Sequence, residues 1–544
     1  MNEIFRRLKT SGSPFTHRGE TQNGPTKSKI MESLSQGYKA QSMRRAVPSL
    51  SEDERGDSSS TRVRAGNEAT EAAVLTDEVL LLVLRYLSPE ELFRCRAVCR
   101  GWLSLAMDPS LWRDRSINTL FDRVLAANVL RHAPCLGSVV MQDFGWDSIL
   151  WGALITTSCA ISGLHFSFNA EDVLQVALAI SRQAFLGRLT DLSLDREVLK
   201  HPRSHQSMSP FSERSLCALL LNICNIRGLE YLHISPLHCP SLIPPLPDLL
   251  VAVPVPASLK NLKWSDDKLN PFLSLLLEWH AATLEVVSVT ADDPRLAPLL
   301  SSLPRLRSLC CGLLVGMAAL LQCPSLQSLE VDFDNDVDTR PRLAGFSSYL
   351  LSAAARLEHL KLAFNQNPSE EALDLVLCLG GSQGEGRAAL RSLTLSHHFD
   401  AQPTALLQRL AAVMPRLLNL TKLDVGGVPS AAFLESLAHT HCVAVLPGLL
   451  ELVVSAPLEC AHQWAHSQQL HDVMRGKPRL HVVVRDLPGC YDRYCHFCAS
   501  HKCHQCIAYW CVIFTHPKEA RCELTHQDAA DDGQVVDEID IKWG

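Results

Sequence analysis

Residues 73–114 decide the fold of the amino-terminal part of this chain, and they read AVLTDEVLLLVLRYLSPEELFRCRAVCRGWLSLAMDPSLWRD. This stretch predicts three short helices separated by clear start and stop signals. Thr76 can cap the first helix, and Asp77 and Glu78 follow it in the opening turn. Negative charge is favourable there, because the amino-terminal end of a helix carries partial positive charge.

This first helix is apolar on nearly every side. One face carries Val79, Leu82, Val83 and Tyr86, and a second face carries Leu80, Leu84 and Leu87. A helix with two apolar faces has to be covered on more than one side. Three helices in about forty residues bury too little core to be stable alone, so the pattern predicts docking to a partner or to the rest of the chain.

The second and third helices complete the bundle. Ser88-Pro89-Glu90-Glu91 is typical of a capping box with proline at the first helical position. The third helix is expected to carry Val98, Trp102 and Leu105 at helical spacing and to end before Asp108-Pro109. Together with the first helix, these signals predict a small three-helix bundle.

The segment resembles an F-box. The family pattern of Leu-Pro-x-Glu, an apolar helix, an acidic second helix, Val-Cys-x-x-Trp and a Leu-Trp pair reads here as Leu75-Thr76-Asp77-Glu78, Leu80 to Leu87, Glu90-Glu91-Leu92, Val98-Cys99-Arg100-Gly101-Trp102 and Leu111-Trp112. Thr76 stands where the family usually has proline. The resemblance implies docking to a Skp-family adaptor, and through it to a cullin. The residues it assigns to that contact are Leu80, Leu84, Leu87, Leu92, Val98, Trp102, Leu111 and Trp112.

Composition narrows the remaining possibilities. The 544 residues are 47% hydrophobic, and 51 basic against 58 acidic side chains give a net charge of −7. This balance does not favour nucleic acid as a partner, and no apolar run reaches the ~20 residues of a membrane helix. The amino terminus lacks a secretory signal, so the cysteines are expected to be reduced or metal-bound and the protein to be in the cytoplasm or nucleus.

A motif of the form LxxLxL recurs behind the helical segment. Clear copies start at Leu189, Leu229, Leu259, Leu284, Leu306, Leu326, Leu357, Leu390, Leu420 and Leu449, and weaker copies at Leu136, Ile161 and Leu480. Helix-like stretches separate the copies. From Leu229 onward they follow one another at intervals of 20 to 33 residues, which is close to the ~20–29 residues of a leucine-rich repeat.

The repeats predict an α/β solenoid of parallel strands with helices, and they resemble the leucine-rich repeats that accompany F-boxes. The Asn or Cys that usually ends the strand motif is mostly missing. The fourth and sixth residues of each copy should point into the core, and the third, fifth and seventh toward the inner face of the sheet. We expect that face to bind a protein substrate through residues such as Tyr231, His233, Lys263, Glu330, Asp332, Lys361 and Asp424.

Seven cysteines fall within Cys490–Cys522. The pairs Cys495-x2-Cys498 and Cys503-x2-Cys506 could supply the four thiolates of a zinc site. Their four-residue separation is much shorter than that of a zinc ribbon, so two alternatives stay open. One is a second ligand set, formed by Cys503, Cys506, Cys511 and His516. The other is a reduced, metal-free element that packs against the last repeat or is palmitoylated.

The predicted organisation is a disordered arm (1–72), an F-box (73–118), an irregular leucine-rich-repeat solenoid (119–487), a Cys/His-rich module (488–526) and an acidic disordered tail (527–544). No catalytic constellation emerges. The sequence therefore favours a non-catalytic receptor that presents a substrate to a Skp–cullin–F-box ubiquitin ligase. The alternatives are a non-degradative scaffold with the same two binding regions, and a zinc enzyme built on the cysteine module.

Overall fold

The structure is a computed structural model that describes residues 76–119, 123–141, 148–196, 213–235, 255–266, 269–333, 340–364, 369–380, 388–397, 404–438, 446–455, 467–477 and 479–485. The chain divides into two units, Met1–Val74 and Leu75–Gly544, and every described residue belongs to the second. The predicted arm, Cys/His-rich module and acidic tail lie outside the described residues, so those predictions stay untested.

Four short helices precede the sheet in the part of the chain that the structure describes: α3 (Asp77–Leu84), α4 (Pro89–Cys95), α5 (Arg100–Ala106) and α6 (Pro109–Trp112). The sequence predicts three, because Asp108-Pro109 indicates the end of the third helix. Here Pro109 is the first residue of α6, and the Asp108 side chain caps that helix by accepting the Ser110 N–H at 2.8 Å. The expected third helix begins at Arg100, so Val98 lies before it.

Two capping predictions have different outcomes. The capping box is confirmed: Ser88 Oγ accepts the Glu91 N–H at 3.3 Å, and the Glu91 carboxylate accepts the Ser88 N–H at 2.9 Å. These hydrogen bonds to Ser88 lower the pKa of Glu91. The prediction for Thr76 is wrong in its detail, because Thr76 occupies the N-cap position of α3 without any hydrogen bond from a backbone N–H to its side chain.

Fourteen parallel strands form one sheet in chain order. They are β1 (Ser116–Asn118), β2 (Cys135–Met141), β3 (Ala160–Phe168), β4 (Asp191–Arg196), β5 (Tyr231–Ile234), β6 (Asn261–Trp264), β7 (Val286–Val289), β8 (Ser308–Gly312), β9 (Ser328–Phe333), β10 (His359–Phe364), β11 (Ser392–His397), β12 (Lys422–Asp424), β13 (Glu451–Ser455) and β14 (His481–Arg485).

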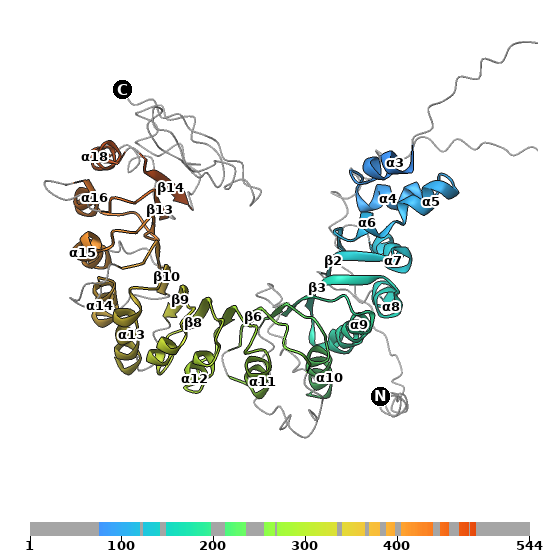
Figure 1. Cartoon of the computed structure of the whole chain (residues 1–544), viewed down its shortest axis with the longest axis horizontal. Coiled ribbons are helices and arrows are strands. Elements are labelled where there is room, and N and C mark those ends of the chain that lie inside the picture. The colour runs from blue at the N-terminus through green and yellow to red at the C-terminus, as the bar shows by residue number, and fades with distance from the viewer. Residues whose placement is uncertain are drawn as a thin grey trace, which may run out of the picture. The chain divides into compact units, whose positions relative to one another are not determined.

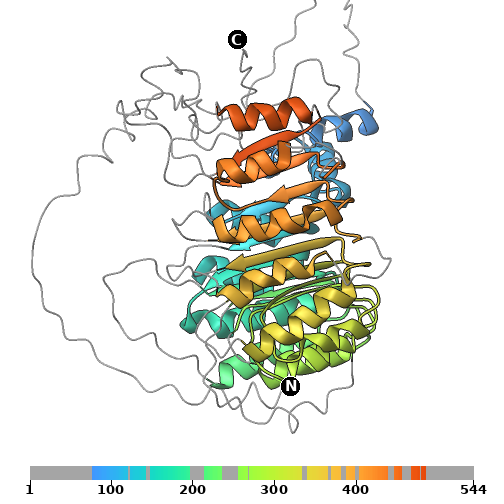
Figure 2. The same ribbon diagram turned by 90° about the vertical axis from the view of Figure 1, so that its left-hand side faces the viewer.

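Helical segments connect the strands, as parallel pairing requires. They are α7 (Arg123–His132), α8 (Ser148–Thr156), η2 (Ala170–Asp172), α9 (Val173–Leu186), α10 (Glu213–Cys224), α11 (Pro271–Trp279), α12 (Leu296–Ser301), η4 (Met317–Gln322), α13 (Arg340–Ala353), α14 (Glu370–Cys378), α15 (Thr404–Val413), η5 (Met414–Arg416), α16 (Ala431–Ala438) and α18 (Gln468–Gly476). They lie on one side of the sheet (Figure 1). Figure 2 shows the later strand–helix units following one another in the same orientation.

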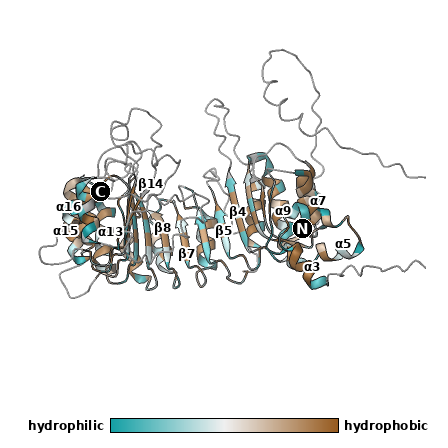
Figure 3. Cartoon of the chain, turned by 90° about the horizontal axis from the view of Figure 1, so that it is seen from above, coloured by the Kyte–Doolittle hydropathy of each residue, from teal (hydrophilic) through white to brown (hydrophobic). Residues whose placement is uncertain are grey.

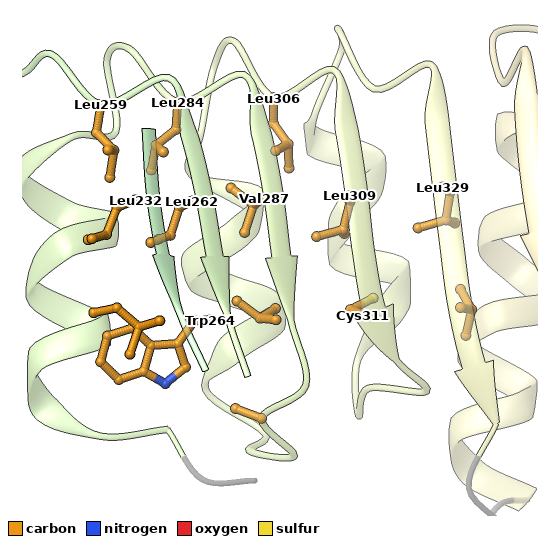
Figure 4. Close-up of a cluster of buried hydrophobic side chains, with 14 of the residues drawn as sticks. Leu232, Leu259, Leu262, Trp264, Leu284, Val287, Leu306, Leu309, Cys311 and Leu329 are labelled. Carbon is orange, nitrogen blue, oxygen red and sulfur yellow. The ribbon is translucent and has the colours of Figure 1, made fainter. Parts of the chain in front are cut away.

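The repeated motif explains the core. At its fourth position, Leu232, Leu262, Val287, Leu309 and Leu329 stand on five neighbouring strands and are all buried (Figure 4). Strands about 4.8 Å apart bring each of these side chains against its counterparts on both sides. The sixth position points the same way, so the helical side of the sheet is apolar. The predicted α/β architecture of parallel strands and helices is confirmed.

The two ends of the sheet differ in detail from the prediction. The sequence did not predict β1, which pairs with β2 through Ile117 and Val139. The copy that was expected to start at Leu480 is shifted by one residue: Val482 pairs with Leu452, and Val484 with Val454. Val482 therefore takes the inward place that the expected register gave to Val483.

Buried polar groups join neighbouring repeats. His280, which follows α11, is buried, and its Nδ1 accepts the N–H groups of Ser258 at 3.2 Å and Leu259 at 3.4 Å. Burial lowers the pKa of His280, since the charged imidazolium is poorly solvated there. The neutral ring thus holds the loop that leads into β6.

Candidate functional site

The helix α3 has a buried and an exposed half. Leu80 and Leu84 are buried, while Val79, Leu82, Val83 and Tyr86, which we call the α3 apolar face, are exposed. Leu82 is 54% exposed and Tyr86, just beyond the helix, is 90% exposed. Figure 3 shows the strongly hydrophobic colouring of α3. Four large apolar side chains at i, i+3, i+4 and i+7 form a continuous stripe, which is the pattern of a helix that a partner covers.

The buried half holds the small helical bundle together. Leu84, Leu92 and Trp112 have no exposed surface, and Leu111 has almost none. The indole Nε1 of Trp112 donates to the Ala106 carbonyl at 2.7 Å, which satisfies its polar group inside the core. These residues fix the position of α3 relative to α5 and α6.

The eight residues that were predicted to contact an adaptor fall into two groups. Val98 is 62% exposed, and Leu87 and Trp102 are half-buried. The other five lie in the core of the bundle: Leu80, Leu84, Leu92, Leu111 and Trp112. A buried side chain cannot touch a partner without rearrangement, so in this structure these five support the exposed residues rather than forming a surface themselves. The sequence identified both faces of α3 but selected residues of the inner one.

The helical bundle is joined to the first strands by hydrogen bonds. Arg115, just before β1, donates through Nε to the Leu111 carbonyl at 3.2 Å and through its other guanidinium nitrogen to the Arg85 carbonyl. Arg188, before β4, reaches back to the Arg113 carbonyl at 3.1 Å. These bonds fix the orientation of the α3 apolar face with respect to the sheet.

The second candidate surface is the face of the sheet opposite the helices, which we call the open face. The predicted substrate-binding residues on it are not equally accessible. Lys263 is exposed, and five are half-buried: Tyr231, His233, Glu330, Asp332 and Lys361. Asp424 is buried, and its carboxylate accepts the Gly426 N–H at 3.1 Å, so it serves the turn after β12.

A polar cluster covers β3 to β5 of the open face. Ser193 Oγ lies 3.1 Å from His233 Nδ1 and 3.3 Å from the Asp195 carboxylate, and His233 Nδ1 lies 3.7 Å from Asp195. Burial lowers the pKa of His233, although Asp195 acts in the opposite direction. In the same cluster, burial raises the pKa of Asp191, and His165 opposes that shift.

The Ser193–His233–Asp195 contacts are not those of a nucleophilic triad. In a triad the serine and the aspartate hydrogen-bond to different nitrogens of the histidine, so that the ring can relay a proton. Here both groups approach the same nitrogen, Nδ1. The geometry favours a polar recognition surface.

Further along the open face, opposite charges are paired. Lys361 forms a salt bridge with Glu330 between β10 and β9, and Lys422 Nζ lies 2.9 Å from the Glu451 carboxylate between β12 and β13. Cys310 lies between these strands and β7, and burial together with Glu330 raises the pKa of its thiol to about 11. This thiol therefore stays protonated at neutral pH.

The residues that the sequence analysis missed on the open face are His165, Asp191 and Asp195. Asp191 and Asp195 occupy the third and seventh positions of the copy LTDLSLD, which were already expected to face this side. The available signal was the negative charge at two of the three outward positions of one strand.

The metal prediction falls outside the described residues, because Cys495, Cys498, Cys503 and Cys506 all lie beyond residue 485. Within the described ranges, no three His, Cys, Asp or Glu side chains are placed to hold a metal ion. The ten cysteines of those ranges are free thiols. Of the helices in the same ranges, none has the length and hydrophobicity that crossing a membrane requires.

Comparison with known proteins supports the F-box resemblance of the amino-terminal helical segment. A family model described as F-box-like matches residues 77–118, which contain all four short helices. The chain is also 47% identical over 45 residues to F-box/LRR-repeat protein 5 of Salmo salar, a match that covers 8% of this chain and 6% of that protein. The resemblance inferred from the sequence is confirmed for this segment, and the chain spans only a small fraction of that relative's length.

Proposed function

On the premise that this chain is an F-box protein, we propose that it is the substrate-recognition subunit of a Skp–cullin–F-box E3 ubiquitin ligase complex. The α3 apolar face would dock on a Skp-family adaptor, and the open face of the sheet would hold the target protein. The observation that carries the proposal is the uncovered stripe Val79, Leu82, Val83 and Tyr86 on a helix whose other half is packed in the core.

The mechanism is one of proximity. The adaptor would connect the chain to a cullin, and the cullin to a RING protein and a ubiquitin-charged conjugating enzyme. Holding a target lysine near the activated ubiquitin raises its effective concentration, so the chain needs no catalytic residue. The hydrogen bonds from Arg115 and Arg188 support this role, because a rigid join fixes the direction in which the target is presented.

The sheet supports the receptor role through its size and chemistry. Fourteen strands present a long face whose outward residues are mostly polar or charged, with apolar exceptions such as Val286 and Val453. Surfaces of this kind give specificity for protein partners through complementary charge. We propose that the strand–helix units are leucine-rich repeats, and that the protein acts in the cytoplasm or nucleus, where its partners are other proteins.

Co-purification of the adaptor tests the docking role. We expect the double variant Leu82→Glu with Val83→Glu to retain at least tenfold less Skp-family adaptor than the wild type, since it places two charges in an apolar contact. The matched control is Val124→Glu with Leu174→Glu, which changes two exposed apolar residues on α7 and α9. Equal adaptor recovery from both variants would contradict the proposed docking face.

Ubiquitin transfer tests the receptor role. Proteins that co-purify with the wild type should accumulate in ubiquitinated form when the proteasome is inhibited, and should not do so with the Leu82→Glu, Val83→Glu variant. Partners whose ubiquitination and abundance never respond would indicate the non-degradative scaffold instead. Zinc in the Cys/His-rich module stays a prediction, which metal analysis of the purified full chain would test.

A further inference from the structure

The charge on the open face is unevenly compensated. Glu330 is paired with Lys361, and Glu451 with Lys422. The two carboxylates of β4, Asp191 and Asp195, have no lysine or arginine partner among the described residues. The uncompensated negative charge is therefore concentrated on one strand.

The environment of Asp191 indicates a missing donor. Its Oδ1 atom is buried, and no hydrogen-bond donor reaches it within the described ranges. A desolvated carboxylate oxygen without a donor is costly, and burial accordingly raises the pKa of Asp191. A cation beside this half-buried carboxylate would stabilise its ionised form.

The neighbours of Asp191 are suited to a cationic side chain. Tyr231 is the register partner of Asp191 on β5, and its half-buried ring supplies an aromatic surface beside the carboxylate. Arginine pairs with carboxylates in a bidentate fashion and stacks on aromatic rings. Asp195 lies four residues further along the strand, about 13 Å away, so an extended segment with several basic residues can reach both carboxylates.

From this geometry we propose that the open face between β3 and β5 is a subsite for a basic segment of the target protein, whose arginine or lysine side chains pair with Asp191 and Asp195. The inference rests on the proposed receptor function and names the chemistry of what that receptor binds. The subsite is built by two carboxylates, Tyr231 and the hydroxyl of Ser193.

The histidine on β5 makes the subsite sensitive to pH. His165 on β3 opposes the pKa shift of Asp191, and His233 on β5 contacts Asp195. Among the described residues, Lys263 on β6, the register partner of His233, also acts on His233 and lowers its pKa. Acidification protonates His233, which adds positive charge beside Asp195. Binding of a basic segment should therefore weaken as the pH falls below the ordinary histidine range.

The test is a titration of the purified full chain with a fluorescent peptide of alternating serine and arginine, compared with a peptide of alternating serine and glutamate. We expect binding of the arginine peptide only. The variant Asp191→Asn with Asp195→Asn should bind it about tenfold more weakly. The control variant Glu278→Gln with Glu435→Gln removes the same charge from exposed positions on α11 and α16 and should change the affinity less than twofold.

The pH arm uses His233→Gln. Wild-type affinity should fall several-fold between about pH 7.5 and about pH 5.5, and this variant should lose most of that dependence. Equal weakening by the β4 and control variants, or no binding of the arginine peptide, would overturn the inference. The assay uses neither adaptor nor ubiquitin, so its failure leaves the co-purification test of the proposed function unaffected.

Discussion

Two short, leucine-rich helices in this chain differ in how far their apolar side chains are buried. In α11, Phe272, Leu273, Leu276 and Leu277 are all buried against neighbouring repeats. In α3, Leu80 and Leu84 are buried while Val79, Leu82 and Val83 are exposed. A helix inside the array obtains its cover from the units before and after it. Among the described residues, α3 is covered on one side only, which supports the proposal that a partner covers its second apolar face.

The largest expected difference between these helices is in stability. Phe272→Ala should lower the free energy of unfolding by about 3–5 kcal/mol, because it leaves a cavity between β6 and α11. Leu82→Ala should change it by less than about 0.5 kcal/mol, because the side chain is already in solvent. Chemical denaturation followed by circular dichroism measures both values. A large loss with Leu82→Ala would mean that α3 is covered within the chain.

A smaller difference in stability is expected between the N-cap residues of α4 and α3. Ser88→Ala removes a capping-box hydrogen bond and should cost about 1 kcal/mol. Thr76→Ala should cost only a few tenths, since the Thr76 side chain accepts no backbone hydrogen bond. The two variants can be compared by the denaturant midpoint at constant slope. Equal costs would show that Thr76 does cap α3 in solution.

His280 should make the array less stable in acid. Its pKa is lower in the folded chain than in the unfolded chain, where the histidine value is about 6.5. The unfolded chain therefore binds more protons as the pH falls below that value, and stability decreases until the folded pKa is passed. His280→Asn keeps an acceptor for the loop but does not titrate, so the melting temperature of this variant should depend less on pH between about 7.5 and about 5.5.

The smallest effect is expected at the strand entrances. Lys260 Nζ lies 2.8 Å from the Glu230 carboxylate, and both side chains are about half exposed. Replacing Lys260 with methionine should change the free energy of unfolding by less than about 0.5 kcal/mol, because water and salt screen such pairs. A loss above 1 kcal/mol would show that charge pairing between repeats contributes as much as a helix cap.

The sequence was sufficient to predict the fold wherever the apolar residues of the LxxLxL motif repeat. The alternation in LxxLxL predicted both the strands and their inward side chains, because period two is imposed by the strand itself. It was less sufficient for predicting the first and last strands of the sheet. The three residues of β1 carry no complete motif. At β14 the apolar run from Val482 to Val484 is compatible with either register, so the pattern alone does not decide that Val482 pairs with Leu452.

The site was predicted less well than the fold. The family resemblance located the helical bundle, but it did not distinguish the residues that support a surface from those that form it. Leu84 and Trp112 are buried while Leu82 and Tyr86 are exposed, and only the packing of α4 to α6 decides which face of α3 is left free. Likewise, Glu330 and Glu451 are paired with lysines on neighbouring strands. Among the described residues, Asp191 and Asp195 have no such lysine or arginine partner, and the sequence of β4 alone does not show this.

The most direct test of the account is a side-chain footprint of the purified chain with and without a Skp-family adaptor. On adaptor binding, labelling of Val79, Leu82, Val83 and Tyr86 should fall strongly, while labelling of Val124 and Phe185, which are exposed on α7 and α9, should not change. A bound adaptor that leaves the α3 apolar face labelled as in the free chain would contradict the account.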